Sequence, residues 1–177
     1  MSNVNNAAIG ELPRDLIFTF QYIYQPAGMK VTMEAFREAE SAEYDACRFM
    51  LDGRMVAFRV AKTTPTKIGQ FVTCWKRPVA KIMPLDLSDN VDFLVVNVSD
   101  AIHRGQFVFP QETLVEQGIM SANSKGGKLA FRIYPPWTKP VAKAAIKSQQ
   151  WQLSYFFPIA ERSNIDLERV RKLFFKG

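Results

Sequence analysis

The chain has 177 residues and a net charge of +6, and 47% of its residues are hydrophobic, which is typical of one soluble globular domain. Its densest apolar stretches, VDFLVVNV and LSYFFPI, have the length of strands, so we expect no membrane insertion. The two cysteines, Cys47 and Cys74, form no CxxC pair, so neither a disulfide scaffold nor a cysteine-based metal knuckle is indicated.

The first segments of the chain predict a tail followed by helices. Residues 1–10, MSNVNNAAIG, lack the basic and apolar regions of a signal peptide, so we expect a disordered tail, a single domain over 11–177 and a cytoplasmic protein. Pro13 to Tyr24 has an apolar face at helical spacing. The acidic segment Met33 to Glu40 predicts a short helix with Thr32 as its N-cap.

A β-hairpin is the clearest local prediction. Tyr44 to Leu51 and Arg54 to Ala61 alternate in polarity around Asp52-Gly53, a dipeptide that type I′ turns favour. On the second strand one face carries Val56, Phe58 and Val60, and the other carries Met55, Ala57, Arg59 and Ala61. We therefore expect Arg59 to emerge on the less buried face of this strand.

The remaining elements predict an α+β fold with a curved, mostly antiparallel sheet or pseudobarrel and peripheral helices. A loop over Lys62 to Lys67 precedes a strand that starts at Gly69. The further strands are expected over Val91–Val98, Gly105–Phe109, Lys128–Tyr134 and Trp151–Phe157, and the further helices over Pro110–Gln117, Pro140–Gln149 and Asp166–Phe175.

The tetrapeptide GQFV occurs twice, at Gly69 and again at Gly105. Glycine permits a tight entry into a strand, and Phe-Val places an aromatic and a β-branched residue on opposite faces. Because the flanking sequences differ, we interpret the repeat as two similar strand starts and not as an internal duplication.

The charges are segregated along the chain. Residues 53–85 contain seven basic and no acidic side chains, and residues 117–160 contain six basic and no acidic ones. A solvated surface usually mixes both signs, so this pattern favours a polyanionic partner, with a merely well-solvated basic surface as the alternative.

Catalysis has little support in the sequence. His103 is the single histidine, and no Asp or Glu is followed two residues later by Lys, as a common metal-dependent nuclease site requires. Glu38, Glu40 and Glu43 are the acids that could hold a divalent ion, although an exposed acidic helix end explains them as well. P-loop and dinucleotide fingerprints are absent from the sequence. We therefore expect no catalytic residues, no metal and no cofactor, and both cysteines to be buried structural thiols.

The basic segments also contain groups that suit nucleic acids. Lysine and arginine attract phosphates, hydroxyls and amides bond phosphates or base edges, and Trp75 either stacks on a base or belongs to the core. Lys139, Lys143 and Lys147 are spaced along one face of the expected helix, either as a phosphate-tracking stripe or as a solvated surface. The predicted contact residues are Arg59, Lys62, Thr64, Lys67, Gln70, Trp75, Lys76, Arg77, Lys125, Lys128, Arg132, Lys139, Lys143 and Lys147.

Five blocks between about residues 35 and 158 resemble the MepB family of bacterial proteins. They are EAESAEYDAC, FRVAKTTPTKIGQFVTCWKRP, GQFVFPQETLVEQGI, GKLAFRIYPPW and KSQQWQLSYF. The resemblance implies a small cytoplasmic protein, sometimes associated with multidrug-efflux loci, for which nucleic-acid binding is proposed and no enzymatic activity is established. A shorter phrase, Phe109 to Gly118, is similar to DNA-binding pseudobarrels of plant B3 domains and restriction-enzyme effector domains.

We therefore expect a non-catalytic nucleic-acid-binding protein, with DNA favoured over RNA and duplex DNA over single strands. The first basic segment would position the nucleic acid, and the second would flank the same groove. The alternatives are a metal-dependent nuclease that uses acids from residues 38–43, and an accessory protein that docks an acidic partner or an efflux complex.

Overall fold

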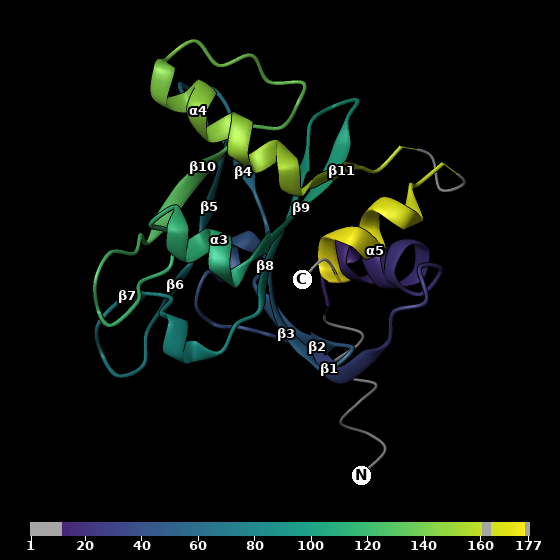
Figure 1. Ribbon diagram of the computed structural model, residues 1–177, viewed down its shortest axis with the longest axis horizontal. Coiled ribbons are helices and arrows are strands. Elements are labelled where there is room, and N and C mark those ends of the chain that lie inside the picture. The colour runs from purple at the N-terminus through teal and green to yellow at the C-terminus, as the bar shows by residue number, and fades with distance from the viewer. Residues whose placement is uncertain (1–11, 161–163, 176–177) are drawn as a thin grey trace.

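A six-stranded mixed sheet lies at the centre of the computed structural model, which describes residues 12–160 and 164–175 (Figure 1). The expected tail over 1–10 lies outside the described residues. The strand order is β1-β2-β3-β8-β9-β11, and every neighbouring pair is antiparallel except β3 with β8. Its strands are β1 (Val31–Arg37), β2 (Cys47–Leu51), β3 (Arg54–Val60), β8 (Phe93–Ser99), β9 (Arg104–Pro110) and β11 (Phe156–Pro158).

A second, three-stranded sheet is built largely from the long connection between β3 and β8. Its order is β10-β5-β4, with β4 (Lys62–Thr63), β5 (Gln70–Thr73) and β10 (Ala130–Ile133). The chain continues from β5 into a small hairpin of β6 (Trp75–Lys76) and β7 (Met83–Pro84). Helices α3 (Gln111–Glu116) and α4 (Lys143–Gln152) lie on the side of this second sheet (Figure 1).

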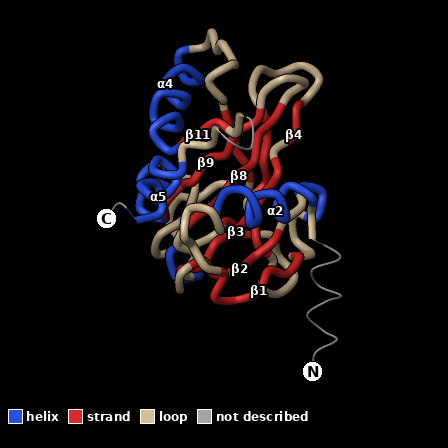
Figure 2. Tube along the Cα trace, turned by 90° about the vertical axis from the view of Figure 1, so that its right-hand side faces the viewer, coloured by secondary structure: helices blue, strands red, loops and turns tan. Residues whose placement is uncertain are grey.

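Alternating side chains divide the interior into two apolar cores, one on each face of the central sheet. On one face Val56 and Phe58 pack with α2 (Arg14–Thr19), the π-helical turn Phe20–Tyr24 and α5 (Leu167–Phe175). The other face, represented by Ala57 and Leu94, packs against inward side chains of the second sheet, among them Val72, Phe131 and Ile133. Figure 2 shows α2 in front of the central strands. The predicted α+β class, with mostly antiparallel strands and peripheral helices, is confirmed.

Several local predictions are confirmed. The hairpin turns at Asp52 and Gly53, whose φ angles of 48° and 77° are both positive, as a type I′ turn requires. Helices occur where Pro13, Pro110 and Asp166 were expected to introduce them, although the first one tightens into a π-helical turn.

Two element assignments were wrong. The segment from Met33 is part of strand β1, because it pairs with β2 along the edge of the sheet and buries Ala35. Thr32 does not cap a helix, and its hydroxyl accepts a hydrogen bond of 2.8 Å from the Gly53 N–H. At the other end Trp151 still belongs to α4 and packs on Phe109, so only Phe156 to Pro158 forms the expected last strand.

Both GQFV segments begin strands, and each glycine accommodates an aromatic ring. A Cβ on Gly69 would come within 2.8 Å of a Tyr134 ring carbon, and one on Gly105 within 2.3 Å of the Phe156 ring. Real Cβ contacts do not occur below 3.0 Å, so any other residue would displace these rings. The repeat thus reflects a shared packing requirement at two strand starts.

Both cysteine thiols are buried, as predicted. Burial raises the pKa of Cys47 to about 11 and that of Cys74 to about 12, so at neutral pH both thiols are protonated. A protonated, buried thiol is a poor nucleophile.

Gln152 protects the outer edge of β10. Its Nε2 donates to the Arg132 carbonyl at 2.9 Å, and its Oε1 accepts from the Tyr134 N–H at 2.9 Å. A single side chain therefore replaces a neighbouring strand and fastens α4 to the second sheet.

We expect the substitution Gln152→Leu to lower the free energy of unfolding by about 2–4 kcal/mol, because two backbone groups lose their partners. Urea denaturation measures this difference. The exposed neighbour Gln150 provides the control, since Gln150→Leu removes no hydrogen bond that holds β10. Equal unfolding midpoints for the two variants would show that the edge is not held by Gln152.

Candidate nucleic-acid interface

The structure brings the two basic segments together on the outer face of the second sheet. Phe71 on β5 lies directly opposite Lys62 on β4 and Arg132 on β10. Residues that face each other across antiparallel strands share one side of a sheet. Because Val72 and Phe131 point into the core, Lys62, Phe71 and Arg132 form a row on the opposite, outer side.

Tyr44 completes this row, and cations lie over both aromatic rings. The Lys62 ammonium is 5.0 Å from the centroid of the Tyr44 ring, and the Arg132 guanidinium is 5.6 Å from that of Phe71. The two rings are themselves 6.3 Å apart. We call Tyr44, Lys62, Phe71 and Arg132 the aromatic–cation row. Its cations supply phosphate attraction, and its rings offer surfaces for stacking.

The loop that positions Tyr44 contains two residues in the left-handed region. Ser41 has a φ of 60° and Asp45 a φ of 51°, which is uncommon for residues other than glycine. The Thr73 hydroxyl donates to Ser41 Oγ at 2.6 Å and ties the loop to β5, while Asp45 pairs with Arg37 at 3.3 Å. Such conformations persist where the surroundings hold them, and they often occur at binding sites.

Arg132 also positions the loop that carries Lys67. Its Nη2 donates to the Thr64 hydroxyl at 2.7 Å, and its Nη1 donates to the Ile68 carbonyl at 3.3 Å. Lys67 lies between these two anchor points and is exposed. The Thr64 hydroxyl therefore holds the loop in this structure, a role the sequence did not suggest.

Trp75 lies just beyond the end of β5, at the start of β6. Burial alternates from Gln70 to Trp75, which places Trp75 on the same side as Phe71 and Thr73. The ring is half-buried, and the Arg77 guanidinium lies 5.4 Å from its centroid. Lys76 is engaged in an ion pair of 2.7 Å with Asp89. Trp75 thus has both a packed side and a side that reaches solvent.

The second basic segment contributes exposed lysines around this sheet. Lys125 and Lys128 lie in the turn region that leads into β10, and both are exposed. Lys143 and Lys147 are one helical turn apart on α4, but Lys139 lies in the preceding loop. The helix was predicted to begin at Pro140, but α4 begins at Lys143. The expected stripe of three lysines is therefore reduced to a pair one turn apart.

Arg59 and Gln70 were misplaced by the sequence analysis. The Arg59 side chain is only 1% exposed, because the second sheet covers the face that carries it. Its Nη1 donates to Glu38 at 3.2 Å and to the Phe58 carbonyl at 2.9 Å, and burial lowers its pKa while Glu38 opposes that shift. The Gln70 amide is buried as well and donates to Thr63 and to the Ser99 carbonyl.

Tyr44 and Phe71 were not among the predicted contacts. Strand alternation within GQFV does place Phe71 opposite the buried Val72, which was a usable signal. Tyr44 gave no such signal, because its position depends on a loop that folds back onto β5 from a distant part of the chain.

Glu38, the first acid of the segment considered for a metal, is occupied by two arginines. Its Oε1 accepts from Arg59 at 3.2 Å, and its Oε2 lies 3.3 Å from Arg48. Within residues 12–160 and 164–175 no three His, Cys, Asp or Glu side chains are grouped to hold a metal ion. Over the same ranges no helix combines the length and apolar character needed to cross a membrane.

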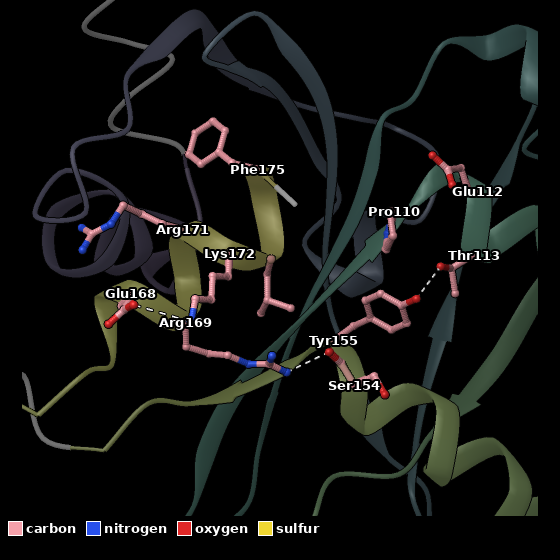
Figure 3. Close-up of a pocket in the computed structure, with 11 residues that line it drawn as sticks. Pro110, Glu112, Thr113, Ser154, Tyr155, Glu168, Arg169, Arg171, Lys172 and Phe175 are labelled. Carbon is pink, nitrogen blue, oxygen red and sulfur yellow. Dashed lines mark hydrogen bonds and ion pairs between the residues drawn. The ribbon is translucent and has the colours of Figure 1, made fainter. Parts of the chain in front are cut away.

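A groove of about 1000 Å³ lies apart from the aromatic–cation row, between α5 and the region of α3 (Figure 3). Several of its polar groups are engaged within the protein. Arg169 crosses the groove to donate to the Ser154 carbonyl at 2.7 Å, and Thr113 donates to the Tyr155 hydroxyl at 2.8 Å. The Arg169 contact fastens α5 to the turn Leu153–Tyr155, and the Thr113 contact joins α3 to the same turn.

His103, the single histidine, packs at the tip of the β8–β9 hairpin. Its Nδ1 lies 2.9 Å from Asp100, and its ring stacks on Trp137 with centroids 4.9 Å apart. The hydrogen bond to His103 lowers the pKa of Asp100. These contacts join the hairpin tip to the turn before α4.

Comparisons with known proteins agree on one family. The model of the MepB-like family matches residues 38–158. A solved structure described as the crystal structure of MepB has 34% sequence identity and a TM-score of 0.70, and the match covers 81% of this chain and 95% of that chain. No curated protein matched the sequence.

Proposed function

The chain belongs to the MepB-like family, and from this premise we propose that it is a DNA-binding protein that holds duplex DNA through the aromatic–cation row without cutting it. The observation that carries the proposal is the direct cross-strand alignment of Lys62, Phe71 and Arg132. Two chain segments without acids are thereby joined into one face that presents cations and aromatic rings together.

The arrangement of this face favours a duplex over a single strand. Arg132 lies over the Phe71 ring, and Lys62 lies over Tyr44, so each ring already has a cation on one of its faces. A duplex offers phosphates on its outside and keeps its bases stacked inside, whereas a single strand binds chiefly by stacking. Phosphate contacts of this kind position the DNA without reading its sequence.

The engagement of Glu38 with two arginines disfavours the nuclease alternative, since a metal would have to displace both. A cytoplasmic location forms part of the proposal, as a protein that binds DNA requires access to it.

Titrations by fluorescence anisotropy test the proposal. The probes are a duplex of about 20 base pairs, two helical turns, its single strand and an RNA of the same sequence. The duplex should bind most tightly, in the micromolar range. A preference for the single strand or the RNA would contradict the choice of duplex DNA, and a lack of binding to all three would refute the proposed function.

Lys143 and Lys147 give a second prediction. Both are exposed on α4, which Gln152 holds against β10. If both contact phosphates, the double variant Lys143→Gln/Lys147→Gln should make the slope of log affinity against log salt less negative by about two, one for each lost contact. The order of affinity among different DNA sequences should be unchanged. A variant with the parent's affinity and salt slope would show that this part of α4 is only solvated.

A further inference from the structure

The β6–β7 hairpin presents apolar side chains to solvent between two cations. The loop over residues 77–82 has the sequence RPVAKI, and Val79 at its centre is 90% exposed. Pro78 and Ala80 on either side are exposed as well, and Arg77 and Lys81 flank them. Ile82 and Met83 in the same hairpin are also exposed, so Val79 belongs to a run of exposed apolar residues and is not an isolated one.

The base of the hairpin is firmly held. Trp75 pairs with Pro84 and Lys76 with Met83, and the Lys76 ammonium bonds Asp89 at 2.7 Å. Beyond the hairpin the Leu85 carbonyl accepts a hydrogen bond of 2.8 Å from the Ser121 N–H. The loop therefore projects from a fixed support, at the lower left of the view in Figure 1.

The loop is also on the side of the proposed DNA surface. Trp75 of β6, at the base of the loop, lies on the same side of the chain as Phe71 of β5, and the Arg77 side chain lies over the Trp75 ring. The loop has six residues, three on the way out and three on the way back. At ~3.3 Å per residue its tip therefore extends up to about 10 Å beyond the paired strands. This reach exceeds the depth of about 7.5 Å of the minor groove of B-DNA.

We propose that this loop enters the minor groove and that Pro78 and Val79 wedge between adjacent base pairs and bend the duplex, an inference that rests on the proposed DNA binding. Apolar wedges of this kind partly unstack a base step and kink DNA by about 20–90°. Arg77 and Lys81 then contact the phosphates that border the groove, which is the role of the cations beside the apolar tip.

Duplex DNA suits the loop better than an anionic membrane does. Even a single myristoyl chain gives only marginal membrane binding, and the tip residues Pro78, Val79 and Ala80 bury far less apolar surface. The neighbouring aromatic–cation row also continues the cationic contacts along a duplex, whereas a flat bilayer would meet the hairpin tip alone.

Energy transfer between dyes on the two ends of a duplex of about 30 base pairs, with a flexible TA step at its centre, measures the bend. The wild-type protein should raise the transfer efficiency. Val79→Ser should abolish the rise, lower the affinity about tenfold through the lost apolar burial, and keep the salt slope. Val79→Phe should increase the bend. Val141→Ser is the matched control, because Val141 is 80% exposed and lies outside the hairpin.

The outcomes separate this inference from the proposed function. If Val79→Ser binds and bends the duplex as the wild type does, the wedge is refuted while DNA binding stands. If the wild type binds no duplex, both are refuted. Binding to phosphatidylserine vesicles that depends on Val79, without any bending of DNA, would assign the loop to a membrane surface and overturn the wedge.

Discussion

Replacing Arg59 by methionine should lower the free energy of unfolding by about 3–5 kcal/mol, the cost of removing one partner from a buried ion pair. The guanidinium is almost fully buried and bonds Glu38, the Phe58 carbonyl and the Thr73 carbonyl. It thereby joins the residue that follows β1 to β3 and β5 across the boundary between the two sheets. The variant removes the donor of these three hydrogen bonds and leaves Glu38 paired with Arg48 alone.

Urea denaturation measures this loss, with Lys172→Met as the control. Lys172 forms an exposed ion pair of 3.5 Å with Glu168 on α5, which should contribute about 0.5 kcal/mol or less. The folded Arg59→Met protein should also keep its DNA affinity, because a buried arginine contacts no phosphate. An affinity loss near the factor of about 15 that one phosphate contact contributes at ~50 mM salt would mean that Arg59 does reach the DNA.

Reversing the charges of Lys62 and Lys67 should weaken duplex binding by about 100-fold or more at ~50 mM salt, since each phosphate contact contributes a factor of about 15 there. Lys62 belongs to the aromatic–cation row, and Lys67 lies on the loop that Arg132 holds. Both ammonium groups are exposed, so the double variant Lys62→Glu/Lys67→Glu should fold normally.

The matched control is Lys30→Glu/Lys172→Glu, which changes the net charge equally at exposed positions before β1 and on α5. Arg169 and Arg171 are unsuitable for this purpose. Arg169 bonds the Ser154 and Phe156 carbonyls, and Arg171 bonds that of Ala27, so their loss would loosen α5. Equal loss of affinity in the two lysine variants would indicate diffuse attraction and no localised site.

Local patterns predicted those parts of the fold that depend on neighbouring residues. Asp52-Gly53 identified the turn, and alternation correctly separated Val56 and Phe58 from Ala57 and Arg59. Alternation along β3 could not predict which of its two faces remains exposed to solvent. The face with Arg59 is covered by a sheet whose strands come from residues 62–73 and 130–133, and that packing is nonlocal.

The candidate site was predictable to a similar extent. Charge segregation pointed to Lys62, Lys67 and Arg132, because a missing counter-charge is visible in the sequence alone. The burial of Gln70 and the placement of Tyr44 depend on tertiary contacts with Ser99 and Phe71. An acidic segment such as Met33 to Glu40 resembles a helix locally and becomes a strand because β2 offers it an edge to pair with.

The salt dependence of duplex binding tests whether the exposed cations hold DNA by its phosphates. If four to six of the exposed cations contact phosphates, log affinity should fall against log salt with a slope of about −4 to −5. Anisotropy titrations at about 50 and about 200 mM salt should then differ by at least ~100-fold in affinity. An affinity that does not change between these two concentrations would show that the protein does not bind DNA through phosphate contacts.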